Sequence, residues 1–127
     1  MKRELQFGRE ARNSLKKGID LASRTVGISY GPTGRNVLIH SKNEKPQLTK
    51  SGSQVLKHLS RSDHYENMGI KILREVSKKT HKQTGDGTTT SVLLTAALIR
   101  HGIKLLHGGV SISDLQSGLD HGLDVVR

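Results

Sequence analysis

Two glycine-rich segments contain the residue types that could bind a phosphate group. The first, Gly85-Asp86-Gly87-Thr88-Thr89-Thr90, lies between two helical patterns. Glycines let the main chain approach a ligand closely, and the first amides of the following helix are free donors at its positive end. The threonine hydroxyls add donors, and Asp86 could hold a Mg²⁺ ion that bridges phosphates. The alternative is that Asp86 or a threonine merely caps the second helix.

The second segment, Tyr30-Gly31-Pro32-Thr33-Gly34-Arg35-Asn36, follows a helical pattern and precedes a strand pattern. Its main chain could also approach a nucleotide, and the alternative is an ordinary helix-to-strand turn. Neither segment fits the P-loop, because no Gly-Lys-Ser/Thr follows four variable residues, and neither fits the dinucleotide fingerprint. Each segment alone therefore allows both a binding and a structural interpretation.

The composition limits the protein class. The chain has 127 residues, which is room for one domain, and it has no cysteine. The lack of cysteine excludes disulfides, thiolate zinc sites and a cysteine nucleophile, and it is compatible with a reducing cytosol. No run of 18 apolar residues is present, and Met1-Lys2-Arg3-Glu4 does not begin a secretory signal. We therefore expect a cytoplasmic protein without a membrane span.

The apolar spacing predicts a mainly α fold with one small β-hairpin, whose strands are 36–40 and 47–50 around a polar turn at 41–46. Helices are predicted over 7–27, 53–59, 63–84 and 88–106, with the last of these central because it is apolar on most sides. Ser111 or Ser113 is expected to cap a final helix. The expected inner face of that helix consists of Ile112, Leu115, Leu119, Leu123 and Val126. That helix is still in register at Arg127, so we expect the domain to be incomplete at its C-terminus.

The formal net charge of +10 is unevenly distributed, because residues 1–86 hold 18 basic and eight acidic side chains. A basic stripe on the predicted helix 63–84 could contact nucleic acid or another polyanion, or it could be a solvated face. The four residues of this stripe are Lys71, Arg74, Lys78 and Lys82. The seven histidines give no pair at a spacing of three or four residues, which makes a histidine metal site a weak hypothesis.

Five motifs in order resemble the N-terminal equatorial segment of group I, GroEL-type chaperonins. They are Phe7-Gly8 with Ala11-Arg12, Gly31-Pro32-x-Gly34-Arg35-Asn36-Val37, Thr49-Lys50-x-Gly52, Glu66-Asn67-Met68-Gly69, and Gly85-Asp86-Gly87-Thr88-Thr89-Thr90. The resemblance covers nearly the whole chain with matching spacing. It implies that residues 1–127 form the N-terminal half of an equatorial, ATP-binding domain, without the intermediate and apical domains.

The resemblance also implies roles for single residues. Asp86 would ligate Mg²⁺, Lys50 would lie beside the phosphates and a monovalent cation site for K⁺, and other chaperonin subunits would be partners. The ATP phosphates would lie on Gly87, Thr88, Thr89 and Thr90, and the nucleotide would pack on Ser29, Tyr30, Gly31 and Pro32. Unfolded client proteins would bind only through the domains that these 127 residues lack.

Three departures from the family pattern stand out. Where the family has Thr-Lys-Asp-Gly, this chain has Thr49-Lys50-Ser51-Gly52, so Ser51 replaces the aspartate. A serine hydroxyl does not act as a base near neutral pH. Tyr30 is larger than the aliphatic residue common there and could crowd or stack on adenine. The chain is also strongly basic. We therefore expect impaired ATP hydrolysis, and we expect the apolar faces of the last two helices to drive self-association.

Overall fold

The computed structural model describes residues 5–127 and contains five helices and a two-stranded sheet. The predicted mainly α fold with a small β-hairpin is confirmed. The elements are α1 Gly8–Gly27, β1 Val37–Ser41, β2 Glu44–Thr49, α2 Gly52–His58, α3 His64–Thr84, α4 Thr88–His107 and α5 Ile112–Val126.

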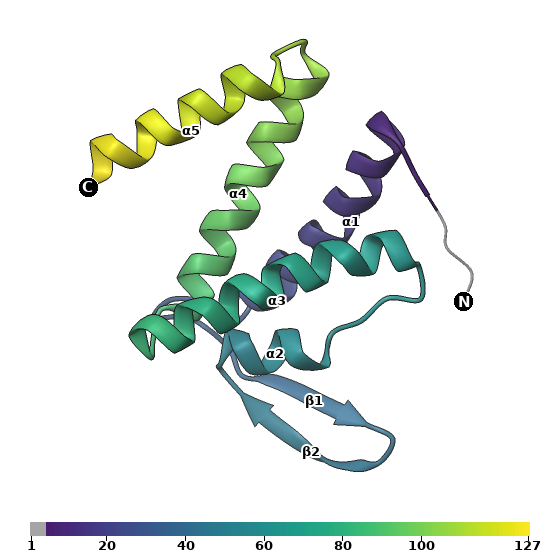
Figure 1. Ribbon diagram of the computed structural model, residues 1–127. Helices are drawn as coiled ribbons and strands as arrows, with labels where there is room; N and C mark the ends of the chain where they lie inside the picture. Colours follow the sequence, from purple (N-terminus) through teal and green to yellow (C-terminus); the bar gives the residue numbers. More distant parts are fainter. Residues whose placement is uncertain (1–4) are drawn as a thin grey trace.

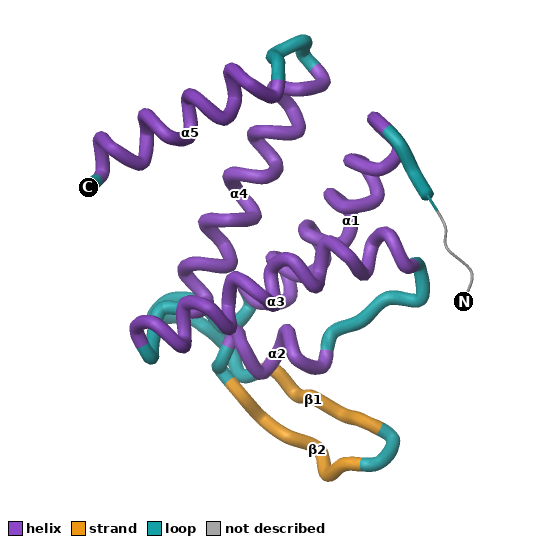
Figure 2. Tube along the Cα trace, viewed as in Figure 1, coloured by secondary structure: helices purple, strands orange, loops and turns teal. Residues whose placement is uncertain are grey.

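Figure 1 shows how these elements are arranged. Helices α1 and α3 cross one another, and α4 starts at the end of α3 and packs against both of them. Helix α2 lies below α3, with the hairpin beneath it, while α5 turns back from the far end of α4. In Figure 2 the loop after α1 and the turn between α3 and α4 lie at the same end of the molecule.

The crossing of α1 and α3 is a contact between two main chains. A Cβ atom at Gly18 of α1 would overlap the carbonyl oxygen of Glu66, and a Cβ at Gly69 of α3 would overlap that of Leu15. Both glycines are buried. Because each glycine meets the main chain of the opposite helix, the helices approach more closely than side chains would otherwise allow.

An aliphatic core surrounds this crossing. It is built from the C-terminal half of α1, the middle of α3, the first half of α4 and two residues of α2. Its buried members are Ile19, Ala22, Val26, Val55, Leu56, Ile70, Leu73, Val92 and Ala96. No aromatic ring belongs to this cluster, so its stability depends on close packing of small side chains.

The bounds of α3 and of the hairpin lie close to the predicted ones. Helix α3 begins after Asp63, whose carboxylate accepts the amides of Tyr65 and Glu66, as expected for a capping residue. The predicted turn over 41–46 is too long, because β2 already begins at Glu44. β2 tolerates Pro46 because it lies between Glu44 and Gln47, where the pairing with Ser41 and Ile39 of β1 is irregular. A proline has no amide donor, and the loss of that donor destabilises a sheet least where the pairing is already interrupted.

The predictions for the last two helices are partly wrong. Helix α4 buries Val92, Ala96 and Ile103, but Leu94 and Leu98 lie on an exposed side. Helix α5 has no buried residue, so the predicted inner face is not covered by the described residues. The helix is capped at Ser111, whose hydroxyl accepts the Asp114 amide at 3.1 Å. No described helix has the length and the apolar character needed to cross a membrane.

The glycine crossing generates a stability prediction. Gly18→Ala should lower the free energy of unfolding by at least about 2 kcal/mol, because the new methyl group must push α3 away from α1. The matched control is Gly118→Ala, a glycine of α5 with nothing within 4 Å of an added Cβ. The control should be neutral or slightly stabilising, since alanine favours a helix over glycine. Urea unfolding followed by circular dichroism measures both, and equal stability of the two variants would contradict the close contact.

Candidate functional site

Three segments that are distant in the sequence meet around one open cavity of about 330 Å³. They are the loop after α1, the junction between β2 and α2, and the turn from α3 into α4. The lining residues are Ser29, Tyr30, Gly31, Lys50, Ser51, Asp86, Gly87, Thr88, Thr89 and Thr90. The structure therefore brings together nine of the ten predicted site residues. Pro32 lies outside the lining, and Ser51 joins it.

The turn between α3 and α4 holds Asp86 at the edge of the cavity. Gly85 and Gly87 flank it with φ angles of 73° and 74°, which lie in the left-handed region that favours glycine. One carboxylate oxygen of Asp86 accepts the Gly87 amide at 2.7 Å, and the Thr84 hydroxyl donates to the main-chain oxygen of Asp86 at 2.7 Å. These contacts fix the carboxylate beside the start of α4.

The N-terminus of α4 forms the second part of this wall. Its N-cap is Gly87, and no side chain caps the helix, so the alternative that Asp86 or a threonine serves as its cap is wrong. The Ser91 amide donates to the Gly87 carbonyl at 3.0 Å. The amides of Thr88, Thr89 and Thr90 precede this bond, so they are the orphan donors at the positive end of the helix dipole.

The loop after α1 forms the opposite wall. Ser29 is buried, and its hydroxyl donates to the Val26 carbonyl at 2.8 Å. The Arg35 amide donates to the Ile28 carbonyl at 2.8 Å, which closes the loop back on the helix end. Tyr30 is 50% exposed, so its ring is available to a ligand in the cavity.

The junction between β2 and α2 completes the site. The Ser51 amide donates to the Thr49 hydroxyl at 2.9 Å, and the Ser51 and Ser53 hydroxyls are 2.8 Å apart. A Cβ at Gly52 would lie 2.6 Å from the Thr89 hydroxyl oxygen, so this junction packs directly on α4. Lys50 is thereby held at the cavity as its single lysine.

The chemistry of the lining suits a phosphate group with a metal ion. Main-chain amides and threonine hydroxyls are donors to phosphate oxygens, and Lys50 adds a positive charge. Asp86 is the single carboxylate among the lining residues, and Mg²⁺ commonly uses one or two carboxylates together with substrate phosphates. Within residues 5–127, no three His, Asp or Glu side chains lie together as a ready-made metal site.

Comparison with known proteins identifies the family. The model of the TCP-1/cpn60 chaperonin family matches residues 22–127, which contain every residue of the cavity lining. This chain belongs to the TCP-1/cpn60 chaperonin family.

Solved chaperonin structures share the fold. A group III chaperonin in the open state superposes with a TM-score of 0.77 at 22% identity, over 91% of this chain and 22% of that one. The second structure is the chaperonin gp146 from the bacteriophage EL 2 (Pseudomonas aeruginosa), solved in the presence of ATP-BeFx. It superposes with a TM-score of 0.67 at 28% identity, over 76% of this chain and 17% of that one. The present chain therefore spans about a fifth of the length of these chaperonins.

The predicted basic stripe of α3 is not a uniform charged face. Lys71, Lys78 and Lys82 are exposed, but Arg74 points back into the protein. Its guanidinium donates to the carbonyls of Leu56 at 3.1 Å and Leu59 at 2.7 Å; Leu56 lies in the last turn of α2 and Leu59 is the C-cap residue. Arg74 is therefore a structural residue that satisfies the C-terminus of α2.

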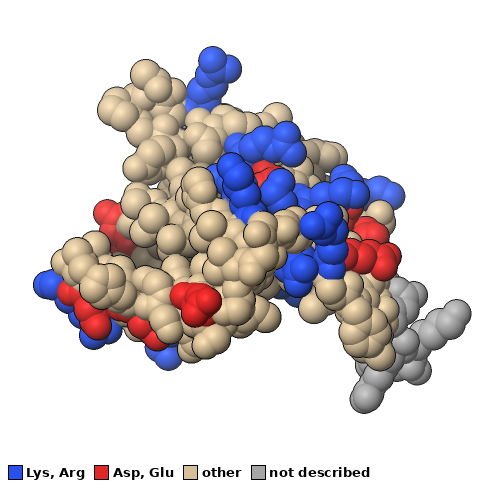
Figure 3. All heavy atoms as spheres, turned by 90° about the horizontal axis from the view of Figure 1, so that it is seen from above, with Lys and Arg blue, Asp and Glu red and all other residues tan. Residues whose placement is uncertain are grey.

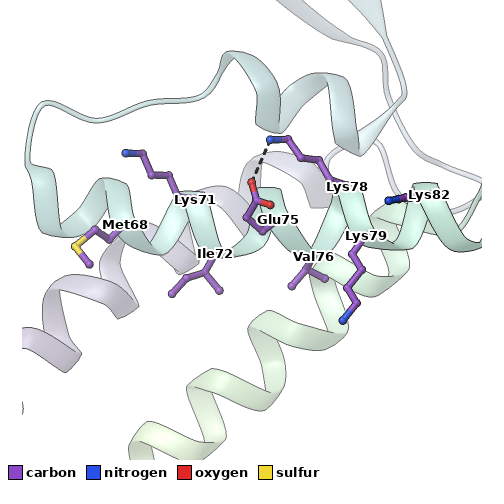
Figure 4. Close-up of a pocket in the computed structure, with 8 residues that line it drawn as sticks. All are labelled: Met68, Lys71, Ile72, Glu75, Val76, Lys78, Lys79 and Lys82. Atoms are coloured by element: carbon purple, nitrogen blue, oxygen red, sulfur yellow. Dashed lines mark hydrogen bonds and ion pairs between the residues drawn. The ribbon is translucent and has the colours of Figure 1, made fainter.

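The apolar side of α3 is also divided in two. Gly69, Ile70, Leu73 and Ser77 are buried, whereas Met68 and Ile72 are exposed. Figure 4 shows Met68, Ile72 and Val76 along one side of the helix with lysines around them. The ion pair drawn there joins Lys78 and Glu75 at 3.1 Å. Only part of the apolar surface of α3 is therefore covered by the described residues.

The position of Arg74 generates a prediction. Arg74→Met should lower the free energy of unfolding by about 1–3 kcal/mol, because it leaves the carbonyls of Leu56 and Leu59 without their charged donor. Lys78→Met, which removes a charge from the same helix at an exposed position, should change it by less than about 0.5 kcal/mol. Chemical denaturation measures the free energy of unfolding of both variants. Equal effects would show that Arg74 is a solvated surface residue like Lys78 and has no structural role.

Proposed function

We propose that this chaperonin chain binds Mg·ATP at the cavity formed by the three segments. The observation that supports this best is the position of Asp86 beside the uncapped N-terminus of α4, at a cavity that Tyr30 and Lys50 line from two other segments. A carboxylate for the metal, helix-end amides for the phosphates and a ring for the base then surround one cavity. The related gp146 chaperonin was solved in the presence of ATP-BeFx.

In this proposal each wall has a separate task. Asp86 holds Mg²⁺, and the amides and hydroxyls of Thr88–Thr90 bind the phosphates. Lys50 neutralises a further phosphate oxygen and lies near a K⁺ site. Ser29, Tyr30 and Gly31 contact the nucleoside, while Pro32 supports the loop from outside the lining.

Binding is expected without efficient hydrolysis. Water must be oriented and deprotonated as it attacks the γ-phosphate, and a carboxylate usually does this. Ser51 stands where the family has Asp, and its hydroxyl is already engaged with that of Ser53 at 2.8 Å. Asp86 is the single carboxylate of the lining. Because it holds the metal in this proposal, no carboxylate remains to deprotonate the attacking water.

We propose the family's larger role for the protein to which residues 1–127 belong. The chain then forms the N-terminal part of an equatorial domain and contacts other chaperonin subunits in an oligomer. Client proteins are folded through domains outside this chain. Membership in group I rests on the resemblance of motifs, and a cytoplasmic location remains the prediction from the sequence. The alternative of a polyanion-binding remnant that uses the α3 stripe is weakened, because Arg74 is turned inward.

Titration calorimetry with Mg·ATP tests the nucleotide site. The chain should bind one Mg·ATP per site, and Asp86→Ala should weaken binding by about tenfold or more, because the metal loses its single protein carboxylate. Asp120→Ala, an exposed carboxylate on α5, is the matched control and should bind as the unchanged chain does. If all three proteins bind equally, or none binds while circular dichroism shows the helical fold, the proposed site is wrong.

Phosphate release tests the hydrolysis part separately. The unchanged chain should release phosphate from ATP slowly, and Ser51→Asp should raise the rate because it restores a carboxylate beside the phosphates. Ser53→Asp places the same charge two residues away and should leave the rate unchanged. Fast hydrolysis by the unchanged chain would show that Ser51 does not impair turnover.

A further inference from the structure

A second cavity, of about 480 Å³, lies between α1 and α4 at the opposite ends of these helices from the nucleotide site. Its lining comes from the first half of α1 and the second half of α4. The lining residues are Asn13, Lys16, Arg100, His101, Ile103, Lys104 and His107. We call this cavity the α1–α4 cleft. Its lining contains three permanently charged cations, two imidazoles and no carboxylate.

Further positive charge surrounds the cleft. The pKa of His107 is lowered from its ordinary value, first by partial burial and then by the positive charges of Arg9, Arg12 and Lys16. These three side chains come from α1, whereas His107 is the last residue of α4. Figure 3, a view of the molecule from above relative to Figure 1, shows Lys and Arg side chains gathered on one part of the surface, with some acidic side chains between and beside them.

The protein itself supplies little negative charge here. Asp20 is shared between two cations, with its carboxylate oxygens 3.4 Å from the Lys16 Nζ and 3.4 Å from the Arg100 Nη1. In residues 5–127, the Nε of Arg12 and the Nε2 of His107 are buried without a hydrogen-bond partner. A buried nitrogen atom without a hydrogen-bond partner destabilises the folded protein unless a ligand or a water molecule provides that partner.

We propose that the α1–α4 cleft binds a small anion with several phosphate groups, such as a short polyphosphate. Ammonium and guanidinium groups approach the cleft from both helices, and such groups form their strongest hydrogen bonds with anionic oxygens. A bound oxyanion would offset the excess positive charge and accept hydrogen bonds from the ammonium and guanidinium groups of the lining, Lys16, Arg100 and Lys104. This binding is independent of the nucleotide site, which lies at the other end of α1 and α4.

The lining favours a small ligand over a macromolecule. Ile103 is the single apolar residue among those that line the cleft, whereas protein partners anchor through several apolar or aromatic side chains. Single-stranded nucleic acid stacks its bases on aromatic rings, and the cleft has only the imidazoles of His101 and His107. Charge dominates this surface, so a compact and highly charged ligand fits it best.

The test is a titration of the chain with inorganic tripolyphosphate in EDTA at low salt. Calorimetry gives the affinity and stoichiometry, and NMR of the imidazole gives the pKa of His107. One tripolyphosphate should bind per cleft, and the pKa of His107 should rise toward its ordinary value. The rise follows because a bound anion favours the protonated imidazole that the neighbouring cations disfavour. Binding without a change at His107 would place the ligand elsewhere and overturn the proposal.

Two matched double variants distinguish binding at the α1–α4 cleft from a general effect of the positive net charge. Lys16→Gln with Lys104→Gln should weaken tripolyphosphate binding by about tenfold or more. Lys78→Gln with Lys82→Gln has the same net charge but changes only α3, and it should bind normally. Lys104→Gln alone, at an exposed position, repeats the test if loss of the Lys16–Asp20 contact disturbs the fold. Equal weakening by both double variants would overturn the proposal.

Three further probes identify the class of ligand. Lys50→Gln, at the nucleotide site, tells the two sites apart through the readout at the cleft. The rise in the pKa of His107 on adding tripolyphosphate should persist in this variant, and loss of that rise would assign the anion to the nucleotide site instead. Oligothymidine and polyglutamate should bind more weakly than tripolyphosphate at equal charge concentration. Tighter binding of oligothymidine would assign the cleft to single-stranded nucleic acid, and tighter binding of polyglutamate would assign it to an acidic protein segment. Either result would overturn the small-anion proposal.

Discussion

The rest of the structure depends on the direct contact between the main chains of α1 and α3. Gly18 and Gly69 lie at the crossing, each against the opposite backbone. The buried residues of α1 after Gly18 then pack on α3 and α4, and the N-terminal half remains free of the core. A side chain at either glycine would separate the two helices and with them the surfaces that hold α2 and α4.

The nucleotide site follows from this crossing. Once α1 and α3 are fixed, the end of α1 and the end of α3 face one another across the start of α4. Short local contacts then set the geometry: two left-handed glycines around Asp86, a buried hydroxyl at Ser29, and a glycine of α2 against Thr89. The helices thus position the site, while the loops supply its chemistry.

Local signals in the sequence predicted the elements well, because caps and breakers act over a few residues. Asp63 and Gly85 bounded α3 as expected, and the hairpin needed only a small correction near Pro46. Spatial relations were harder to predict. The spacing of α3 could not show that Arg74 would reach the carbonyls of α2, since that contact joins residues 18 and 15 positions apart. The two loops were placed in one site through family resemblance, and the α1–α4 cleft was missed because its cations are far apart in the sequence.

Helix α5 has a different relation to the core from the other long helices. It buries no residue, and its interior contains Gly118 and Gly122, which have no neighbour within 4 Å of an added Cβ. Its packing on α4 centres on Leu115 against Gly102. Such an element opens without disturbing the packing of α1, α3 and α4. We therefore expect its amide hydrogens to exchange with solvent through a local opening of α5, at a lower free energy than the global unfolding of the chain.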